Sequence, residues 1–500
     1  MTLQKPLPGT KRACVIGAGL SGLALAIRLQ AAGIQTLVVE ARSAPGGMAT
    51  SERRDGFTFC SGPTALADRN AIDELWALCG TTVEHDLPLL PVEPLSRFSW
   101  PDGGTFDLTV DDAVLTREIA RIAPGDLAGY DEYLRVARAI LSDFRARPGP
   151  APFAGPRDLA LAMPLLARHQ AWRTLASLIA HHIKSERLRE VLAVPALMGG
   201  ANPYSASALL AADHARERAG LWWPEGGIGL LAEKLAGRFA ALGGTIRLND
   251  PVVHVHAMGN RAHEVETQSG WRDRFSAIAS TADRDHTWRD LLGGTSRGAE
   301  LAARTRRLRH APGLFTVHFA LEGTWPGIPH RMVLFGPRFR ALIDDIYEHG
   351  VLPQDQMIWL GHPSVTDPTL APPGKSVFQA GVPVPNLGQL PIDWEAVGPM
   401  LERRVLAEIG RRLVPDIEDR LIVHFHTTPR DLALEFNAAR GTGFGIDPPP
   451  LYRGWQGEVI RDKAFANVYL AGVAAAPGGG LTGALAAART CATTMLEDLS

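Results

Sequence analysis

Apolar and polar residues at the start of the chain are ordered in a way that predicts a strand, a tight turn, a helix and a second strand. The apolar run from Ala13 to Ile16 leads directly into Gly17, and residues 12–40 as a whole have the pattern of a strand, a tight turn, a helix, a second turn and a strand. This order of elements opens a dinucleotide-binding domain of the Rossmann type. We therefore expect an α/β fold whose sheet is built on these two strands.

The turn between the first strand and the helix carries three glycines with the spacing GxGxxG. Gly17 permits the tight turn, Gly19 lets the backbone approach a pyrophosphate, and Gly22 lets the helix pack close to the strand. The phosphates would lie at the helix N-terminus, where unpaired amides favour negative charge. Glu40 ends the second strand at the spacing of a carboxylate that binds ribose hydroxyls. The residues expected at this part of the site are Gly17, Gly19, Leu20, Ser21, Gly22, Glu40, Ala41 and Arg42.

Two further glycine-rich turns follow Glu40, in the phrases "GGMATS" and "GFTFCSGPTAL". They would bring more flexible backbone to the same ligand. The order of glycine fingerprint, strand-end Glu, GG pair and GPT turn resembles that of the flavoprotein desaturases and amine oxidases. The resemblance implies FAD as the cofactor instead of NAD. The residues that it adds to the site are Gly46, Gly47, Met48, Gly62, Pro63 and Thr64.

The same glycine spacing returns near the C-terminus, at Gly478, Gly480 and Gly483, but in different surroundings. Residues 473–477 separate it from the strand "NVYLAG", and no later strand is predicted to supply an acidic residue, so we expect no second nucleotide site. A helix start here would instead aim amides at a reduced flavin, which carries negative charge. In flavoproteins of the carotenoid desaturase type the C-terminal segment has this role, and we expect one site from both ends of the chain. The contributing residues would be Gly472, Leu481, Thr482 and Gly483.

Phrases along the middle of the chain make the resemblance more specific. "APGDLAGYDEYL", "MGGANPYSASAL", "FGPRFRALIDDIY", "VTDPTLAP" and "PVPNLG" follow one another in the order found in bacterial phytoene desaturases of the CrtI type, and the likeness covers almost the whole chain. It implies an FAD-dependent enzyme that introduces double bonds into an acyclic carotenoid such as phytoene. The expected chemistry is hydride transfer to the flavin, with reoxidation by a quinone or oxygen. The resemblance also implies association with a membrane.

The chain is expected to leave the nucleotide domain and return to it. Residues 226–249 read as a glycine turn, an apolar helix, a helix stop at Gly243 and Gly244, and a strand. The backbone near Val253 would then reach the adenine, as in related flavoproteins. The FAD-binding domain is expected from residues 1–85, 222–292 and 451–500, and an α+β substrate domain from 86–221 and 293–450, with a helical, membrane-facing portion at about 110–221.

Residues 158–184 have more apolar positions than a helix with one solvent-facing side needs. Such a segment would suit the wall of a tunnel for a long hydrocarbon, or a membrane surface. A pair of buried helices broken at Pro164 explains the pattern equally well. Both descriptions can hold at once.

Composition restricts the number of domains, the classes of partner and the location that we expect for this chain. A chain of 500 residues has room for two or three domains, and its 51 basic and 53 acidic side chains give no case for a nucleic-acid partner. The four cysteines lack CxxC spacing, which favours a reducing cytoplasmic compartment. The uncharged span 464–488 is interrupted by Pro477 and consecutive glycines, so we expect no transmembrane segment. The expected location is the cytoplasm, at the periphery of the inner membrane.

Candidates for acid–base chemistry and for metal binding are few. Arg157 and Asp158 match an Arg-Asp pair that the family carries at the start of the substrate domain, and Asp158 is the candidate catalytic residue. An Asp that caps its own helix is the competing interpretation. Two HxH pairs, at 254–256 and 424–426, place both rings on one face of a strand, but no third ligand stands nearby. We assign no metal.

The chain departs from the family pattern beside the expected flavin. Met48 stands where Arg is usual, Ala475 and Ala476 replace Thr and His, and the region around Trp455 lacks the family's Arg-Pro-x-Asn run. Cys60 stands where Asp is common, and we expect it to be a small buried apolar residue and not a covalent flavin link. Alternative functions are therefore a redox-neutral carotenoid isomerase or a non-catalytic protein that binds flavin or carotenoid. An amine oxidase is a third, which the N-terminal motifs alone would permit.

Overall fold

The N-terminal strand lies in the middle of a parallel sheet. The computed structural model describes residues 11–145, 156–447, 460–476 and 480–500. Residues 13–16 are buried and pair in parallel with a neighbouring strand on each side. The sheet has five strands, in the spatial order β19 (Val468–Leu470), β13 (Ala277–Ser280), β1 (Arg12–Ile16), β2 (Gln35–Val39) and β9 (Thr245–Arg247).

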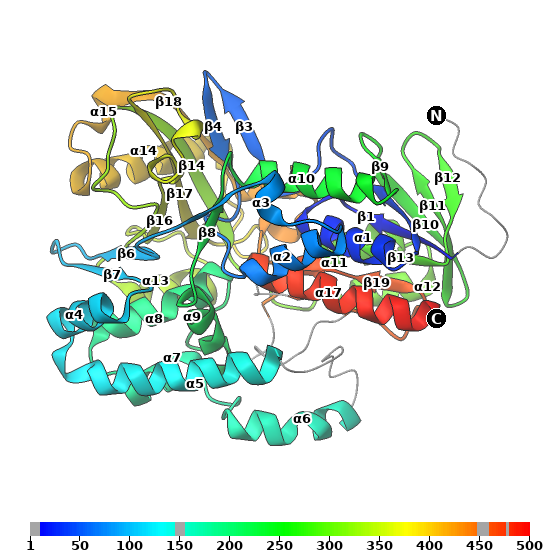
Figure 1. Ribbon diagram of the computed structural model, residues 1–500, viewed down its shortest axis with the longest axis horizontal. Coiled ribbons are helices and arrows are strands. Elements are labelled where there is room, and N and C mark those ends of the chain that lie inside the picture. Colours follow the sequence, from blue (N-terminus) through cyan, green and yellow to red (C-terminus); the bar gives the residue numbers. More distant parts are fainter. Residues whose placement is uncertain (1–10, 146–155, 448–459, 477–479) are drawn as a thin grey trace.

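The first and last helices of the chain lie side by side against this sheet (Figure 1). Helix α1 (Leu20–Ala31) packs against both α10 (Ile228–Ala241) and α17 (Gly480–Leu499). Both ends of the chain therefore build one unit, and the predicted Rossmann-type α/β arrangement is confirmed. A small antiparallel sheet joins it, made of β10 (Val252–Met258), β11 (Arg261–Thr267) and β12 (Arg272–Arg274).

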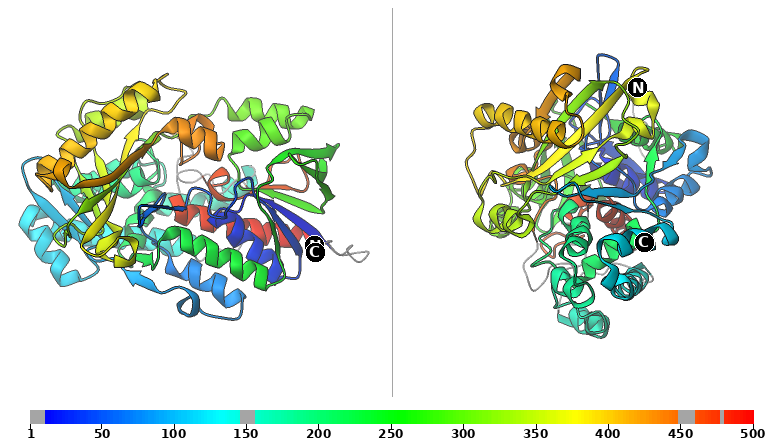
Figure 2. Two further views of the ribbon diagram at one scale, coloured as in Figure 1. Left: turned by 90° about the horizontal axis from the view of Figure 1, so that it is seen from above. Right: turned by 90° about the vertical axis from the view of Figure 1, so that its left-hand side faces the viewer.

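A larger, mostly antiparallel sheet forms the second part of the molecule, and Figure 2 shows it beside the first. Phe315, Phe319 and Phe378 are buried on it beneath α14 (Trp394–Arg412). Only its β15–β6 pair is parallel. Its seven strands are, in spatial order, β18 (Leu421–Thr427), β14 (Gly313–Glu322), β17 (Lys375–Val384), β16 (Ile358–Gly361), β15 (Arg331–Leu334), β6 (Ser96–Ser99) and β7 (Thr105–Leu108).

Helices between residues 112 and 217 form a third layer, at the lower left of Figure 1. Helix α5 packs against α7 and α9, and α6 lies at the edge of the group. The helices are α4 (Asp112–Ile122), α5 (Leu127–Arg145), α6 (Pro156–Arg168), α7 (Leu175–His182), α8 (Glu186–Met198) and α9 (Ala211–Glu217).

The expected helix break at Pro164 is wrong, because α6 runs through this residue and the chain turns only at 169–174. Pro164 has no N–H to give to the carbonyl four residues earlier, which normally interrupts a helix. That carbonyl belongs to Ala160, which is exposed, so water can replace the missing donor.

Two small antiparallel sheets, the β3–β4 hairpin and the β5–β8 pair, complete the strand structure of the described residues. All strands of the parallel sheet fall in the ranges expected for the FAD-binding domain. All strands of the large sheet fall in the ranges expected for the substrate domain. The division into these two domains stays a prediction. No helix in the described ranges is long and apolar enough to span a membrane. The remaining elements are β3 (Ser51–Arg54), β4 (Phe57–Cys60), α2 (Arg69–Leu78), α3 (Val83–Asp86), β5 (Leu89–Pro91), β8 (Trp222–Pro224), α11 (Arg284–His286), α12 (Ser296–Thr305), α13 (Phe339–Asp344), α15 (Ile417–Arg420) and α16 (Pro429–Phe436).

Candidate functional site

The first glycine turn is shaped by close packing at two of its three glycines. Gly17 has φ +101°, and a Cβ there would lie 2.3 Å from the Thr281 hydroxyl oxygen. A Cβ on Gly22 would lie 2.0 Å from the Gly17 carbonyl oxygen. Both positions therefore admit only glycine, and the N-terminus of α1 is held close to the end of β1.

Gly19 differs, because the protein leaves space around it. Its φ is −67°, and a Cβ there would find no atom nearer than 3.8 Å, where the Gly46 carbonyl oxygen and Gly47 Cα lie. The Gly46 N–H donates to the Ala18 carbonyl at 2.9 Å, so the second glycine loop lies against the first. Together these glycines form a cradle at a helix N-terminus that any side chain at residue 19 would fill, which fits a pyrophosphate.

The carboxylate of Glu40 is buried beside this cradle, with a residue exposure of 7%. It accepts hydrogen bonds from the Ala18 N–H at 2.6 Å and the Arg42 N–H at 2.9 Å. The Arg42 guanidinium donates to the Gly47 carbonyl at 3.3 Å and lies over the Phe436 ring. Residues 40–42 are thus tied to both glycine loops, which fits the expected ribose contact.

The segment that follows β9 runs along the end of β2. The Asp250 N–H donates to the Glu40 carbonyl at 3.1 Å, and the Asn249 N–H to the Arg42 carbonyl at 3.0 Å. Burial would raise the pKa of Asp250, but hydrogen bonds from Ser269, Thr267 and Arg247 lower it to about 2. Val253, three residues further on, is the second residue of β10, and its exposure is 45%.

The turn after β4 is held by the large sheet. Gly62 has φ +91°, and a Cβ there would meet the Met48 carbonyl at 2.7 Å. The Thr64 carbonyl accepts from His330 at 3.0 Å, and the Gly62 carbonyl from Gln379 at 3.5 Å. The turn Gly62–Pro63–Thr64 therefore contacts the second glycine loop on one side and the large sheet on the other.

The C-terminal segment returns to the first glycine turn. Gly472 has φ +67°, and a Cβ there would lie 3.1 Å from the Ser21 hydroxyl. The Arg284 guanidinium donates two hydrogen bonds to the Ala474 carbonyl, at 2.9 and 2.7 Å, while burial lowers its pKa to about 10. Residues 481–483 form the first turn of α17, and Gly478 lies outside the described residues.

A small cavity lies between the turn at residues 62–64 and the large sheet. A Cβ on Gly200 would lie 2.4 Å from the Phe444 Cβ and 2.6 Å from its Cγ, so the two residues are in close contact. The Phe444 ring stands edge-on to Trp359, with centroids 6.5 Å apart. A small cavity beside them is lined by Thr64, Ser96, Met198, Arg331, Met332, Val333, Trp359 and Leu360. Most of this lining is apolar, and Arg331 is ion-paired with Glu217 at 3.1 Å.

The remaining candidate residues either have other bonding partners or have side chains outside the described part of the structure. Asp158 is in the first turn of α6, and its side chain is outside what the structure describes, as is Trp455. His424 and His426 both bond the Glu402 carboxylate, at 2.6 and 2.5 Å, and among the described residues no group suits a metal ion. Cys60 is buried and lies 3.4 Å from the Ser51 hydroxyl, and burial raises its pKa.

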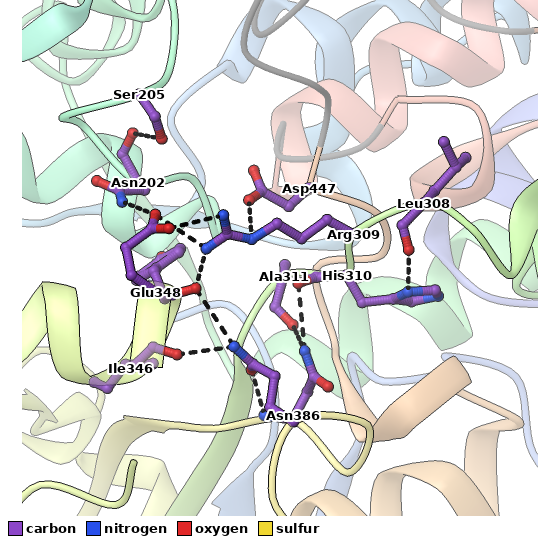
Figure 3. Close-up of polar contacts among 12 residues, drawn as sticks. Asn202, Ser205, Leu308, Arg309, His310, Ala311, Ile346, Glu348, Asn386 and Asp447 are labelled. Carbon is purple, nitrogen blue, oxygen red and sulfur yellow. Dashed lines mark hydrogen bonds and ion pairs between the residues drawn. The ribbon is translucent and has the colours of Figure 1, made fainter. Parts of the chain in front are cut away.

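Two asparagines from the family-like phrases have structural contacts (Figure 3). Asn386 donates to the carbonyls of His310 and Ala311, at 3.3 and 3.0 Å, and Asn202 donates to Glu348 at 3.3 Å. Glu348 also pairs with Arg309 at 3.1 Å. These bonds join the helical layer to the large sheet, so the phrases "MGGANPYSASAL" and "PVPNLG" reflect architecture as much as chemistry.

Sequence reasoning missed Thr281, Arg284, Trp359 and Phe444. Thr281 directly follows β13, and the carboxyl ends of parallel strands meet at one edge of a sheet, so its position was a usable signal. The other three come from distant segments without a local motif.

Comparison with known proteins places the chain in a family. The family described as "Flavin containing amine oxidoreductase" matches residues 20–496. "Phytoene desaturase (lycopene-forming)" of Pantoea ananas is 39% identical over 98% of this chain and 100% of the relative, and that of Paracoccus sp. is 38% identical over 99% of each chain. "Phytoene desaturase (neurosporene-forming)" of Cereibacter sphaeroides is 31% identical over 97% of this chain and 95% of its own.

Solved structures share the fold at low identity. Putrescine oxidase bound to putrescine superposes with a TM-score of 0.62 at 17% identity, covering 97% of this chain and 99% of that one. An oxidoreductase from Methanosarcina mazei gives 0.61 at 16% identity, covering 97% and 100%. The predicted family is therefore confirmed: the chain belongs to the flavin-containing amine oxidoreductases and, among them, to the phytoene desaturases.

Proposed function

We propose that the protein is an FAD-dependent desaturase that introduces double bonds into an acyclic carotenoid, with phytoene as its substrate. The observation that carries this proposal is the glycine cradle of the described residues, to which segments from both ends of the chain contribute. Relatives named lycopene-forming share 38 to 39% identity with the chain, against 30 to 31% for those named neurosporene-forming, which supports lycopene as the product.

FAD, when bound, supplies the acceptor for the hydride that leaves one carbon of the reacting pair. The chain's own residues hold it in place. The amides at the N-terminus of α1 would bind the pyrophosphate, Glu40 the ribose, and the backbone near Val253 the adenine. The first turn of α17, residues 481–483, would offset negative charge on the flavin ring. The proposed cofactor contacts are Gly17, Gly19, Leu20, Ser21, Gly22, Glu40, Ala41, Arg42, Gly46, Gly47, Met48, Gly62, Pro63, Thr64, Val253, Gly472, Leu481, Thr482 and Gly483.

The small cavity beside Thr64 marks where the reacting carbons would be aligned away from water, and the cavity would have to widen to admit a polyene. Trp359 lines this cavity, and the Phe444 ring stands edge-on to Trp359. A polyene has no polar handle, so shape and apolar contact position it. The proton that must also leave would pass to Asp158 or to water.

The membrane-facing surface that we propose is α6 and the turn after it. Leu161, Met163 and Trp172 are exposed there by 69%, 45% and 64%, while Ala162 and Leu166 are buried against the protein. Exposed Trp and Leu side chains on one edge suit insertion into the interface of a bilayer. An apolar substrate would enter from that bilayer, and a quinone dissolved in it, or oxygen, would reoxidise the flavin. We infer a peripheral position on the cytoplasmic side of the inner membrane.

Expression in a bacterial host that accumulates phytoene tests the proposal. Chromatography of the extracted pigments should reveal lycopene in place of phytoene, with the purified protein carrying FAD. Unchanged phytoene beside FAD-loaded protein would identify a binding protein instead. A changed double-bond geometry without longer conjugation would identify an isomerase.

A further inference from the structure

A buried histidine of the large sheet is joined to the turn at residues 62–64. His330 precedes β15 and is 2% exposed. Its Nε2 lies 3.0 Å from the Thr64 carbonyl oxygen, and its Nδ1 lies 2.9 Å from the Thr366 hydroxyl. Both ring nitrogens therefore have a partner, one of them on a turn 266 residues away in sequence.

The partners determine which nitrogen carries the proton. A carbonyl oxygen only accepts, so Nε2 donates to Thr64, and Nδ1 then accepts from the Thr366 hydroxyl. Burial lowers the pKa of His330 to about 3, so the ring stays neutral and keeps this tautomer in the physiological range.

The surroundings fix the ring itself. The Trp223 ring packs edge-on against His330, with centroids 4.9 Å apart. Asp367 in turn accepts from the Trp223 indole N–H at 3.3 Å and from the Gly226 N–H at 2.7 Å. On the turn, the Thr64 methyl lies 3.2 Å from the Cβ position of Gly361 in β16. The imidazole is thus held by the Thr366 hydroxyl on one side, by the Thr64 carbonyl on the other, and by the Trp223 ring edge-on.

We propose that His330 is a positioning residue for the flavin. Its Nε2–H fixes the position of the Thr64 carbonyl relative to the large sheet, and this holds in place the turn that would lie against the flavin ring. This inference rests on the proposed function, because it needs FAD at that turn. His330 would not touch the reacting atoms. Its bond instead sets the distance between the cofactor and the pocket lined by Thr64 and Trp359, where small displacements have large kinetic effects.

The experiment compares His330→Gln, His330→Leu and a matched control, His362→Leu, as purified FAD-loaded proteins. Gln can place a side-chain N–H near the Nε2 position, and Leu has no donor. His362 is the neighbouring buried histidine: its N–H donates to the His330 carbonyl at 2.8 Å, its Nδ1 bonds the Ile328 carbonyl at 2.8 Å, and its ring stacks on Phe378. None of these contacts involves the turn at residues 62–64, and replacement of His362 should destabilise the protein to a comparable extent.

We expect His330→Leu to shift the visible absorption bands and midpoint potential of the flavin and to lower kcat about 100-fold with little change in KM. His330→Gln should restore most of both, and His362→Leu should leave the flavin spectrum and potential as in the wild type. If the two Leu variants behave alike, the inference is overturned and His330 is only a core residue. If His330→Leu does not fold, His330→Gln alone decides the question. This variant keeps an N–H donor, so a 100-fold lower kcat together with a wild-type flavin spectrum would also overturn the inference. Wild-type protein that binds no FAD would instead reject the proposed function.

Discussion

Replacement of Gly19 by Val separates cofactor binding from folding. The backbone at this position has φ −67°, which Val adopts readily, and a Cβ there meets nothing nearer than 3.8 Å. The new side chain would fill the cradle against which the pyrophosphate should lie. We therefore expect a folded protein with little change in its thermal unfolding temperature but with severely weakened FAD binding.

The magnitude follows from the hydrogen bonds that would be lost. A hydrogen bond from a backbone amide to a charged phosphate is worth about 1.5 to 3 kcal/mol. Loss of two such bonds would cost about 3 to 6 kcal/mol, which raises the Kd for FAD about 10²- to 10⁴-fold. Titration of apoprotein with FAD, followed by flavin fluorescence, measures this change directly.

Two other glycines serve as controls. Gly237→Val, on an exposed position of α10 with no atom within 4 Å of the Cβ position, should leave both folding and FAD affinity unchanged. Gly22→Ala should destabilise the protein itself, because its Cβ would lie 2.0 Å from the Gly17 carbonyl oxygen. Wild-type affinity in Gly19→Val would refute the placement of the pyrophosphate at this turn.

Three further predictions concern the ribose site, the membrane and pH. Glu40→Gln should weaken FAD binding about tenfold in the same titration, since the amide is a poorer acceptor for ribose hydroxyls; unchanged Kd would count against this contact. Joint replacement of Leu161, Met163 and Trp172 by Ser should lower binding to phospholipid vesicles at least about tenfold in a sedimentation assay, because each exposed apolar side chain can contribute over 1 kcal/mol when buried; equal sedimentation would exclude α6 as the membrane contact. Burial lowers the pKa of His362 to about 4. Between pH 6.5 and pH 4 this side chain therefore takes up a proton only in the unfolded chain. Its contribution to the free energy of unfolding should fall by about 1.4 kcal/mol for each pH unit of acidification. Urea unfolding of wild type and His362→Gln at pH 7 and pH 5 measures this, and parallel pH dependence of the two would contradict it.

Local spacing was sufficient to predict the strand, turn, helix and second strand that carry the first group of candidate residues. Gly17, Gly19, Gly22 and Glu40 lie within one strand–turn–helix–strand unit, so their positions in sequence determine their geometry. The return of the C-terminal segment was also predictable, because Gly472 follows a strand and α17 begins soon after it.

The rest of the site depends on long-range packing that local patterns do not encode. His330, beside the large sheet, bonds Thr64 in a turn that is distant in sequence, and Phe444 packs against Gly200, which is also distant in sequence. Pro164 was misjudged because its effect on a helix depends on whether the carbonyl four residues earlier faces water, which is a property of the folded surface.

The most direct test of the account is an anaerobic mixing experiment with the FAD-loaded protein and phytoene in phospholipid vesicles. The account predicts that the visible absorption of the oxidised flavin bleaches while absorption of a longer polyene appears. Flavin that stays oxidised in the presence of bound phytoene, or that is bleached by an amine but not by phytoene, would contradict it.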